Sequence, residues 1–476
     1  MTYETVIGLE VHLHLSTRSK VFCGCSTEFG QVPNSQTCPV CLGFPGSLPA
    51  LNEEAFRCAI KVALALNCEI QKSIKFDRKN YYYPDLPKNF QISQYDMPLS
   101  YNGFVDISSE GSRKKIRIKR VHLEEDAGKL IHPEDGSSSL VDFNRSGIPL
   151  LEIVTEPDIA TPAEAYDYLT RLKAILEYLE VSDCDMEKGS LRCDANISVR
   201  PKGDDKLGTK VELKNMNTFK GVRQALEYEI KRQVTLVKDG ERIVQETRLW
   251  DANKAVTTSM RSKEEAEDYR YFPEPDLVPF VVDRDIIEKI KEGLPELPEA
   301  KSARFVKEFG LSEYDAGIIT GQIELANYFE ECAKIYTNKK VIANWLMGDI
   351  MAQLNAKNIE IEKLGISPAG LVSLLDMIDS GAISGKMAKE ILIDMVETKK
   401  PPDEIVRSKG LAQISDVKEL ERIVNMVLKR EERSANDYKK GKKNALAFLV
   451  GQIMKKTKGK ANPAVVNDIL KRNLGE

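Results

Sequence analysis

The hydrophobic periodicity of the chain changes near residue 293. Before it, the chain is rich in alternating apolar and polar residues, which is the pattern of half-buried β-strands. The segment GLPELPEA (293–300) carries two prolines that discourage a continuous helix, and the pattern after it is almost wholly helical. The sequence therefore predicts an α+β fold, with a large mixed-sheet domain over residues 1–293 followed by helices.

A second interruption divides the helical part. TKKPPDE (398–404) combines paired prolines with charges, so we expect an all-helical domain over 294–407 and a small helical tail domain over 408–476. From Lys429 to Glu476 there are 13 Lys or Arg against 5 Asp or Glu, a balance of +8, and because the whole chain carries −4 the remainder carries −12. A basic end of this kind either contacts nucleic-acid phosphates or forms a solvated helical surface.

The first predicted strand, ETVIGLEVHLHL (4–15), has one apolar and one polar face. Its odd-numbered residues from Ile7 onward are aliphatic, whereas Glu10, His12 and His14 share the other parity. Alternate side chains of a strand point the same way, about 7 Å apart, so this carboxylate and these imidazoles can contribute to one site. The other interpretation is an ordinary solvent-facing strand.

Three further segments also carry polar residues that can converge on the same site. RCDANISVR (192–200) places Asp194 on a polar face, KVELKN (210–215) places Glu212 on one, and RVHLEEDAG (120–128) puts acids beside a glycine where a strand should end. Carboxylates with an imidazole are hard ligands suited to Mg²⁺ or Mn²⁺, and Mg²⁺ usually bridges to substrate phosphates. These segments therefore predict nucleotide chemistry.

The phosphate-binding and hydrolytic motifs of common enzymes are absent from the sequence. The nearest approach to a Walker loop, GAISGKM (381–387), has three residues between its glycines and Met after Lys. HExxH, GxSxG and the Gly-Ser-Ser-Gly amidase signature do not occur, so we expect no serine hydrolase centre on this chain. FDRKNYYYPDLPKNFQISQYD (76–96) has cations and aromatic rings that can hold phosphate and adenine, or it is a surface loop with tyrosines packed beneath it.

Four of the nine cysteines form a compact constellation. CGCSTEFGQVPNSQTCPVC (23–41) has a CxC pair, twelve intervening residues and a CxxC pair, a spacing that allows tetrahedral zinc. We expect structural Zn²⁺ rather than free thiols, held by Cys23, Cys25, Cys38 and Cys41. A closed four-sulfur site leaves no open position for water, so a catalytic zinc is disfavoured.

The chain is expected to be cytoplasmic and to have no membrane partner. It contains no apolar run long enough to cross a bilayer. Its start, MTYETVIGLEVHLHL, enters strand alternation at once and lacks the basic and apolar blocks of a secretory signal.

Several motifs together resemble one family, the GatB family, which supplies the B subunit of aspartyl/glutamyl-tRNA(Asn/Gln) amidotransferase. The motifs are IGLEVHLHL, CPVCLGFPGSLPALN, FDRKNYYYPDLPKNFQISQYD, HLEEDAGK, DFNRSGIPLLEIVTEPD, SLRCDANISVR and KVELKNMNTF. The likeness extends to GKKNALAFLVGQIMKKTKGKANP, which is similar to the family's tail domain. It covers essentially the whole chain.

This resemblance implies a cradle domain with a kinase-like site, a helical domain, and a tail domain that holds tRNA. It further implies ATP-dependent phosphorylation of the side-chain carboxylate of Glu-tRNA(Gln), Asp-tRNA(Asn) or both. Ammonia would then displace the phosphate. A partner amidase, the A subunit of the complex, would supply that ammonia from glutamine, and the small C subunit would brace the pair.

The resemblance also assigns roles to residues of this sequence. It implies that Mg²⁺ or Mn²⁺ is held by a subset of Glu10, His12, Glu125, Asp194 and Glu212. Glu10, His12, Glu124 and Glu125 are the expected catalytic residues, with Glu152 as a further carboxylate. Lys79, Tyr81 and Arg192 are expected to contact the nucleotide. Zinc is implied to be a structural option outside the mechanism.

Two rival functions remain open at this point. The chain can be a non-catalytic tRNA-binding and assembly protein of the complex, although the acid and imidazole strand faces argue against that. It can also be an autonomous ATP-dependent amide ligase for a free small molecule, which would not need a basic helical tail.

Overall fold

The computed structural model describes residues 2–133, 138–262, 269–410, 417–439, 442, 444–457, 461 and 463–475. The chain divides into two compact units, Met1–Pro298 and Glu299–Glu476. The first is built on a large mixed sheet and the second, in its described residues, on helices, so the predicted α+β class is confirmed.

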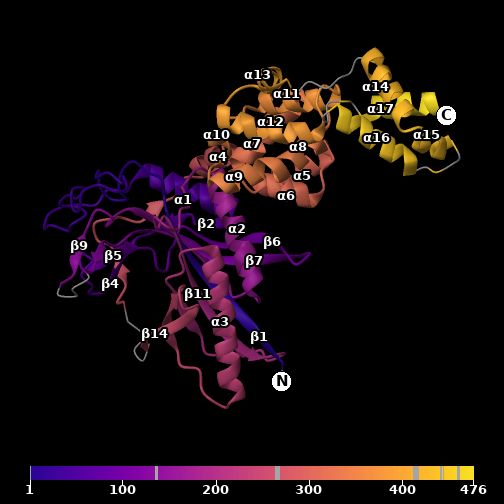
Figure 1. Ribbon diagram of the computed structural model, residues 1–476. Coiled ribbons are helices and arrows are strands. Elements are labelled where there is room, and N and C mark those ends of the chain that lie inside the picture. Colours follow the sequence, from indigo (N-terminus) through magenta and orange to yellow (C-terminus); the bar gives the residue numbers. More distant parts are fainter. Residues whose placement is uncertain are drawn as a thin grey trace. The chain divides into compact units, whose positions relative to one another are not determined.

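A nine-stranded sheet organises the first unit (Figure 1). Its strands, in spatial order, are β14 (Val256–Ser262), β13 (Glu246–Asp251), β12 (Val211–Lys214), β11 (Leu191–Pro201), β1 (Tyr3–His14), β10 (Pro149–Thr155), β7 (Ser112–Glu125), β6 (Ser100–Ser109) and β2 (Glu69–Ile70). Neighbours are antiparallel except β12 and β13. Those two run parallel because helix α3 (Phe219–Lys238) carries the chain back between them.

Helices cover one face of this sheet. Strand β1 turns Ile7, Leu9, Val11 and Leu13 into the core, each at most 1% exposed. Helices α2 (Pro162–Tyr178) and α3 pack on this side (Figure 1). The helices thus bury the apolar side chains of β1. The polar side chains, which alternate with them along the strand, point to the opposite face of the sheet.

In the described residues of the first unit, three short sheets and two more helices accompany the large sheet. The short sheets pair β15 (Phe272–Pro273) with β4 (Asp77–Asn80) and β5 (Phe90–Ser93), β16 (Phe280–Val281) with β3 (Ser73–Ile74), and β8 (Lys129–Ile131) with β9 (Leu140–Asp142). The helices are α1 (Glu53–Ala65) and α4 (Arg284–Glu292). Segment 76–96 is therefore not only a loop, because β4 and β5 form a hairpin whose second strand packs on β7.

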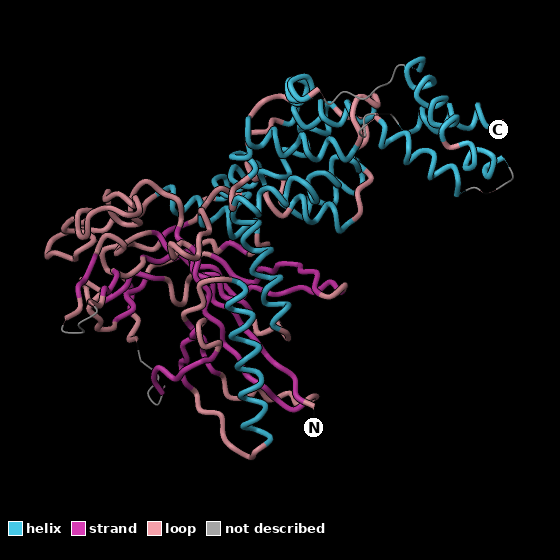
Figure 2. The backbone as a smooth tube through the Cα atoms, viewed as in Figure 1, coloured by secondary structure: helices cyan, strands magenta, loops and turns pink. Residues whose placement is uncertain are grey.

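The second unit consists of helices in its described part (Figure 2). The first group is α5 (Pro298–Phe309), α6 (Glu313–Thr320), α7 (Ile323–Ile335), α8 (Lys339–Trp345), the π-helix η1 (Leu346–Ile350), α9 (Met351–Lys357), α10 (Ile361–Leu364), α11 (Pro368–Asp379), α12 (Gly385–Thr398) and α13 (Pro402–Lys409). The second group is α14 (Val417–Arg430), α15 (Glu432–Lys439), α16 (Asn444–Lys456) and α17 (Pro463–Leu474).

These two groups have separate hydrophobic clusters. One runs from Phe305 to Val406 and the other from Leu420 to Leu474. The division expected near residue 408 stays a prediction. The basic segments 439–444 and 454–463 lie partly outside the described residues. Among the helices that the structure describes, none has the length and apolar character needed to span a bilayer.

Candidate active site

A row of ionisable side chains crosses four adjacent strands on the face away from α2 and α3. The register pairs His122 of β7 with Glu152 of β10, Glu152 with His12 of β1, and His12 with Arg192 of β11. One step further along, Glu10 of β1 pairs with Asp194 of β11. The predicted convergence of polar strand faces is therefore present for these residues.

The two imidazoles alternate with carboxylates. His12 Nε2 lies 3.5 Å from both Glu10 Oε1 and Glu152 Oε2. His122 Nε2 lies 3.4 Å from Glu152 Oε2 and 3.5 Å from Glu124 Oε2. Glu124 also accepts a hydrogen bond of 2.8 Å from the Ser93 hydroxyl on β5. The cluster is buried at its His122 end and opens to solvent towards Glu10, whose side chain is 31% exposed.

These contacts shift the acid–base properties of the cluster. Burial, followed by the neighbouring Glu152 carboxylate, raises the pKa of Glu10. Burial alone would lower the pKa of His122, but Glu152 and Glu124 together raise it to about 9. Burial would raise the pKa of Glu152, yet His122 and His12 hold it well below its ordinary range. The cluster therefore keeps Glu152 ionised between two imidazoles.

The donor set fits a hard divalent cation. Two groups, Glu10 with His12 and Asp194, and His12 with Glu124 and Glu152, each have ligand atoms within 4.8 Å of one another. Carboxylate oxygens and one imidazole per group are ligands suited to Mg²⁺ or Mn²⁺. In addition, the buried Nδ1 of His122 has no hydrogen-bond partner among the described residues.

The hairpin of β4 and β5 carries a cation and aromatic rings to this cluster. Lys79 Nζ lies 4.7 Å from the ring centroid of Tyr269 and 5.7 Å from that of Tyr81. Burial would lower the pKa of Lys79, but the Glu124 carboxylate, the neighbouring Tyr271 and Tyr81, and the Glu152 carboxylate raise it. Tyr271 stacks on Tyr95 at 4.2 Å, and burial raises the pKa of Tyr271 to about 12. The predicted contact residues Lys79 and Tyr81 thus lie near the acidic cluster.

Arg192 is anchored by a carboxylate outside the predicted set of site residues. Asp126 accepts from Arg192 at 2.8 Å and lies 2.6 Å from His14 Nε2. Burial would raise the pKa of Asp126, but the charges of Arg192 and Arg145 lower it well below its ordinary value. Arg192, Arg145 and His14 all line a cavity of about 950 Å³, which is large enough for a nucleotide or the end of an RNA strand.

Glu125 and Glu212, both expected among the metal ligands, lie outside the two groups. Consecutive strand residues point to opposite faces, so Glu125 leaves the face that Glu124 occupies. It contacts Lys88 Nζ at 2.5 Å and accepts from the Ile92 backbone at 2.9 Å. Glu212 is two strands from β1 and accepts from the Thr247 hydroxyl at 2.7 Å. Glu212 Oε1 also lies 3.3 Å from Lys214 Nζ, which pairs with Asp194, so Glu212 adjoins the Glu10 group through this lysine. Glu125 faces away from both groups.

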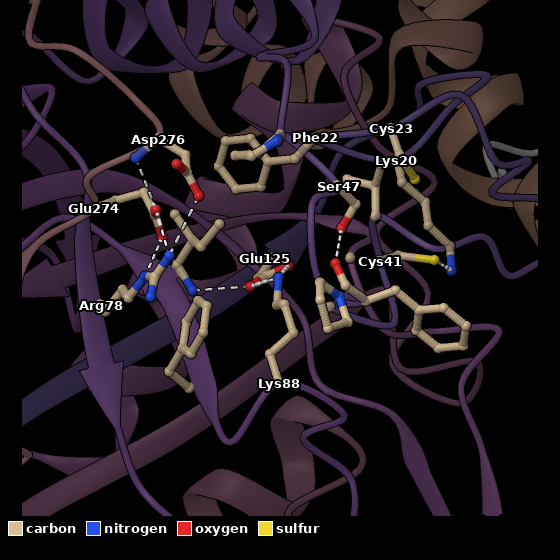
Figure 3. A pocket seen from close by; sticks show the side chains of 18 of the residues that line it. Lys20, Phe22, Cys23, Cys41, Ser47, Arg78, Lys88, Glu125, Glu274 and Asp276 are labelled. Atoms are coloured by element: carbon tan, nitrogen blue, oxygen red, sulfur yellow. Dashed lines mark hydrogen bonds and ion pairs between the residues drawn. The ribbon is translucent and has the colours of Figure 1, made fainter.

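Glu125 instead lines a second cavity of about 240 Å³ (Figure 3). Across it, the Arg78 guanidinium makes two hydrogen bonds to Glu274, of 2.7 Å and 2.8 Å. Glu274 is 2% exposed and comes from a segment nearly 200 residues later in the sequence. No local sequence pattern predicts the pair of Arg78 and Glu274, because it depends on where the β4–β5 hairpin lies in the fold.

The four cysteines of residues 23–41 are brought together as predicted from their spacing. Their sulfur atoms all lie within 4.8 Å of one another, which fits a tetrahedral metal with four thiolates. A hydrogen bond with Cys23 lowers the pKa of Cys41 to about 4, whereas burial raises that of Cys25 to about 11. The other five cysteines are buried in the cores.

The sequence of the chain is similar to known proteins of one family. The GatB/GatE catalytic domain matches residues 5–288, and the GatB domain matches residues 327–474. A protein of Carboxydothermus hydrogenoformans is 56% identical over 477 residues, covering 100% of this chain and 99% of its own. One of Brevibacillus brevis is 55% identical over 472 residues, covering 99% of both chains. Both are named as the B subunit of aspartyl/glutamyl-tRNA(Asn/Gln) amidotransferase.

Proposed function

Because the chain belongs to the family of B subunits of aspartyl/glutamyl-tRNA(Asn/Gln) amidotransferase, we propose that the polar sheet face is where a tRNA-borne carboxylate is activated with ATP. The family membership confirms the resemblance drawn from the motifs and fixes the general activity as tRNA-dependent amidotransfer. The observation that carries the proposal is the alternation of carboxylates and imidazoles across four adjacent strands.

The side-chain carboxylate of the substrate must be activated before ammonia can attack it. A side-chain carboxylate repels nucleophiles and has no leaving group. In the proposed step, a carboxylate oxygen of the glutamate or aspartate attacks the γ-phosphorus of ATP, and ADP leaves. Ammonia then attacks the acyl carbon, and phosphate leaves with the former carboxylate oxygen. Glu-tRNA(Gln), Asp-tRNA(Asn) or both are the proposed substrates.

The proposed role of each site residue in this reaction follows from its position. Mg²⁺ or Mn²⁺ held by Glu10, His12 and Asp194, or by His12, Glu124 and Glu152, would neutralise phosphate charge. Lys79 presents a cation towards Glu124, where it can balance a transferring phosphoryl group. Tyr81 provides an aromatic face beside it. Arg192, held by Asp126, lines the larger cavity, where its guanidinium can contact a nucleotide or RNA phosphate.

Glu125 and Glu212 have a different place in this proposal. Because Glu125 pairs with Lys88 and Glu212 adjoins Asp194 only through Lys214, we assign them to supporting the site and not to holding its cation. Glu125 orders the hairpin through Lys88 and the Ile92 backbone.

The remaining components come from other chains. The sequence lacks an amidase signature, so we propose that a partner amidase makes ammonia from glutamine and that a small third protein braces the pair. The naming of the relatives as a B subunit supports a complex of several chains. The tail domain is proposed to bind tRNA, and the cysteine cluster to hold a structural Zn²⁺. A cytoplasmic location remains a prediction.

The test compares Glu10→Gln and His12→Ala with Glu4→Gln, all on strand β1. Glu4 pairs with Arg200, which is away from the cluster, and therefore serves as the matched control. With the partner proteins and misacylated tRNA, we expect the first two variants to lose about 100-fold or more in ATP cleavage while tRNA binding is kept. Unchanged cleavage would support the rival, a non-catalytic assembly role.

A further inference from the structure

Lys20 is a buried cation beside the cysteine cluster. Lys20 is 0% exposed, and its Nζ donates to Cys41 Sγ at 3.7 Å (Figure 3). The same Nζ also donates to the Phe143 carbonyl oxygen at 3.2 Å. Within the part of the chain that the structure describes, no carboxylate pairs with it. Burying an ammonium group is costly unless an anion accompanies it, so Lys20 needs negative charge nearby.

The sulfur of Cys41 is the group that can supply this charge. Cys41 is 4% exposed, and its Sγ accepts a second hydrogen bond of 3.2 Å from the Cys38 backbone. Two N–H donors directed at one buried sulfur are the surroundings expected of a thiolate that also ligates a metal. Four thiolates around Zn²⁺ carry a net charge of −2, which a neighbouring ammonium group would partly neutralise.

We propose that Lys20 is the counter-ion of the cysteine cluster and strengthens its binding of zinc through Cys41. This inference rests on the zinc site proposed above. Lys20 touches the ligand and not the metal, so it is a positioning residue. Groups that hydrogen-bond to metal ligands usually change metal affinity by about 10-fold to 100-fold when removed.

The same lysine connects the cluster to the wall of the active-site region. Its side chain packs against Gly147, where an added Cβ would lie 3.3 Å from Lys20 Cδ. The Gly147 carbonyl accepts from the Val21 backbone at 2.9 Å, and its N–H donates to the Asp126 carbonyl at 2.8 Å. Asp126 is the anchor of Arg192. A metal-bound cluster would therefore brace the backbone that carries this anchor.

The first experiment measures zinc affinity of the full chain by competition with a chromophoric chelator. Lys20→Met is expected to bind zinc about 10-fold to 100-fold more weakly than the unmodified chain. Lys301→Met is the control, because Lys301 is also buried but pairs with Glu330 at 2.9 Å in the second unit. The control should bind zinc like the unmodified chain. With Co²⁺ in place of zinc, the sulfur-to-cobalt absorption band should move to lower energy in Lys20→Met only.

The outcomes separate the two proposals. An unmodified chain that binds no zinc would overturn the zinc site and the role of Lys20 together. Zinc binding that is equally tight in Lys20→Met, with an unchanged cobalt spectrum, would overturn only the role of Lys20.

A second measurement covers the case in which Lys20→Met is unstable. In metal-free protein, Cys41→Ala should lower Tm by leaving Lys20 without an anion, and Lys20→Met added to Cys41→Ala should raise Tm again. Cys41→Asp should keep Tm closer to that of the unmodified chain, because its carboxylate restores the charge. If Lys20→Met lowers Tm equally in the unmodified chain and in the Cys41→Ala variant, the two residues are not a pair and the proposal is wrong.

Discussion

At the scale of single residues, the site depends on opposite charges that are held together in a buried place. Glu152 is the central example, since it lies between His12 and His122 at 3.5 Å and 3.4 Å. Burial would lower the pKa of each imidazole, but Glu152 and the other neighbouring carboxylates together outweigh it, so the pKa of each is raised. Without a bound cation, the cluster is stabilised by protonation of its histidines.

The titration of His122 gives a pH-dependent stability. Its pKa in the folded protein is about 9, against an ordinary value near 6.5. Its stabilising contribution is therefore complete below about pH 6.5 and is lost as the pH rises through 9. In metal-free protein, Tm should fall from pH 7 to pH 10 more steeply than in His122→Gln, which keeps His12. Equal slopes in a calorimetric series would contradict this assignment.

The buried pair of Lys88 and Glu125 gives a second prediction at this scale. Their side chains are 8% and 4% exposed, so removal of one partner leaves a buried charge alone. Lys88→Met should lower the free energy of unfolding by about 3 kcal/mol, and Lys88→Met with Glu125→Leu should recover much of the loss. Denaturation in urea provides the measurement. A double variant no more stable than the single one would argue against the pair.

At the scale of elements, alternation within each strand was predictable from the sequence, whereas the order of strands was not. The alternating pattern of β1 itself predicts that Glu10 and His12 share the polar face, and the pattern of β11 predicts the same for Asp194. The placement of β10 between β1 and β7 sets Glu152 between two histidines, and this depends on long-range pairing. His122 and Asp126 were visible in the sequence, but no local signal indicated their partners.

The sequence could not predict the orientation of Glu125 for a different reason. The run Glu124, Glu125, Asp126 does not reveal which acid faces the cluster, because the answer depends on the strand's register. The cysteine cluster was easier to predict, since all four ligands come from one short segment whose spacing is itself informative.

Helix α2 offers a prediction about an element boundary. The Thr161 hydroxyl accepts from the Glu164 backbone at 3.1 Å, and the Glu164 carboxylate accepts from the Ala160 backbone at 2.8 Å. Thr161→Ala should cost about 1 kcal/mol of stability in urea denaturation. Thr170→Ala, within the same helix, should cost less than about 0.5 kcal/mol, because its hydroxyl only bonds the preceding turn at Tyr166. Equal losses would mean that the cap does not hold the helix start.

At the scale of the whole molecule, we propose a division of labour between the two units. The first carries the ionisable cluster and the cysteine site, and the second ends in the basic segment. Under this proposal, the basic end would let a chain with net charge −4 bind an anionic substrate.

Deletion of residues 408–476 tests this division. Affinity for tRNA should fall about 10-fold or more, and its dependence on salt should become shallower, because phosphate contacts are lost. Filter binding across a salt series provides the measurement, with circular dichroism of the truncated chain as the control for folding. An unchanged affinity and salt slope would place the RNA-binding surface elsewhere.

We propose that the sheet cluster activates the carboxylate through an acyl phosphate. The most direct measurement supplies the full complex with ATP, glutamine and misacylated tRNA whose side-chain carboxylate is labelled with ¹⁸O, and then weighs the released phosphate by mass spectrometry. We expect one ¹⁸O atom in each phosphate from the unmodified protein, and loss of labelled phosphate with Glu10→Gln. Amide formation with unlabelled phosphate would show that the carboxylate is not activated as an acyl phosphate.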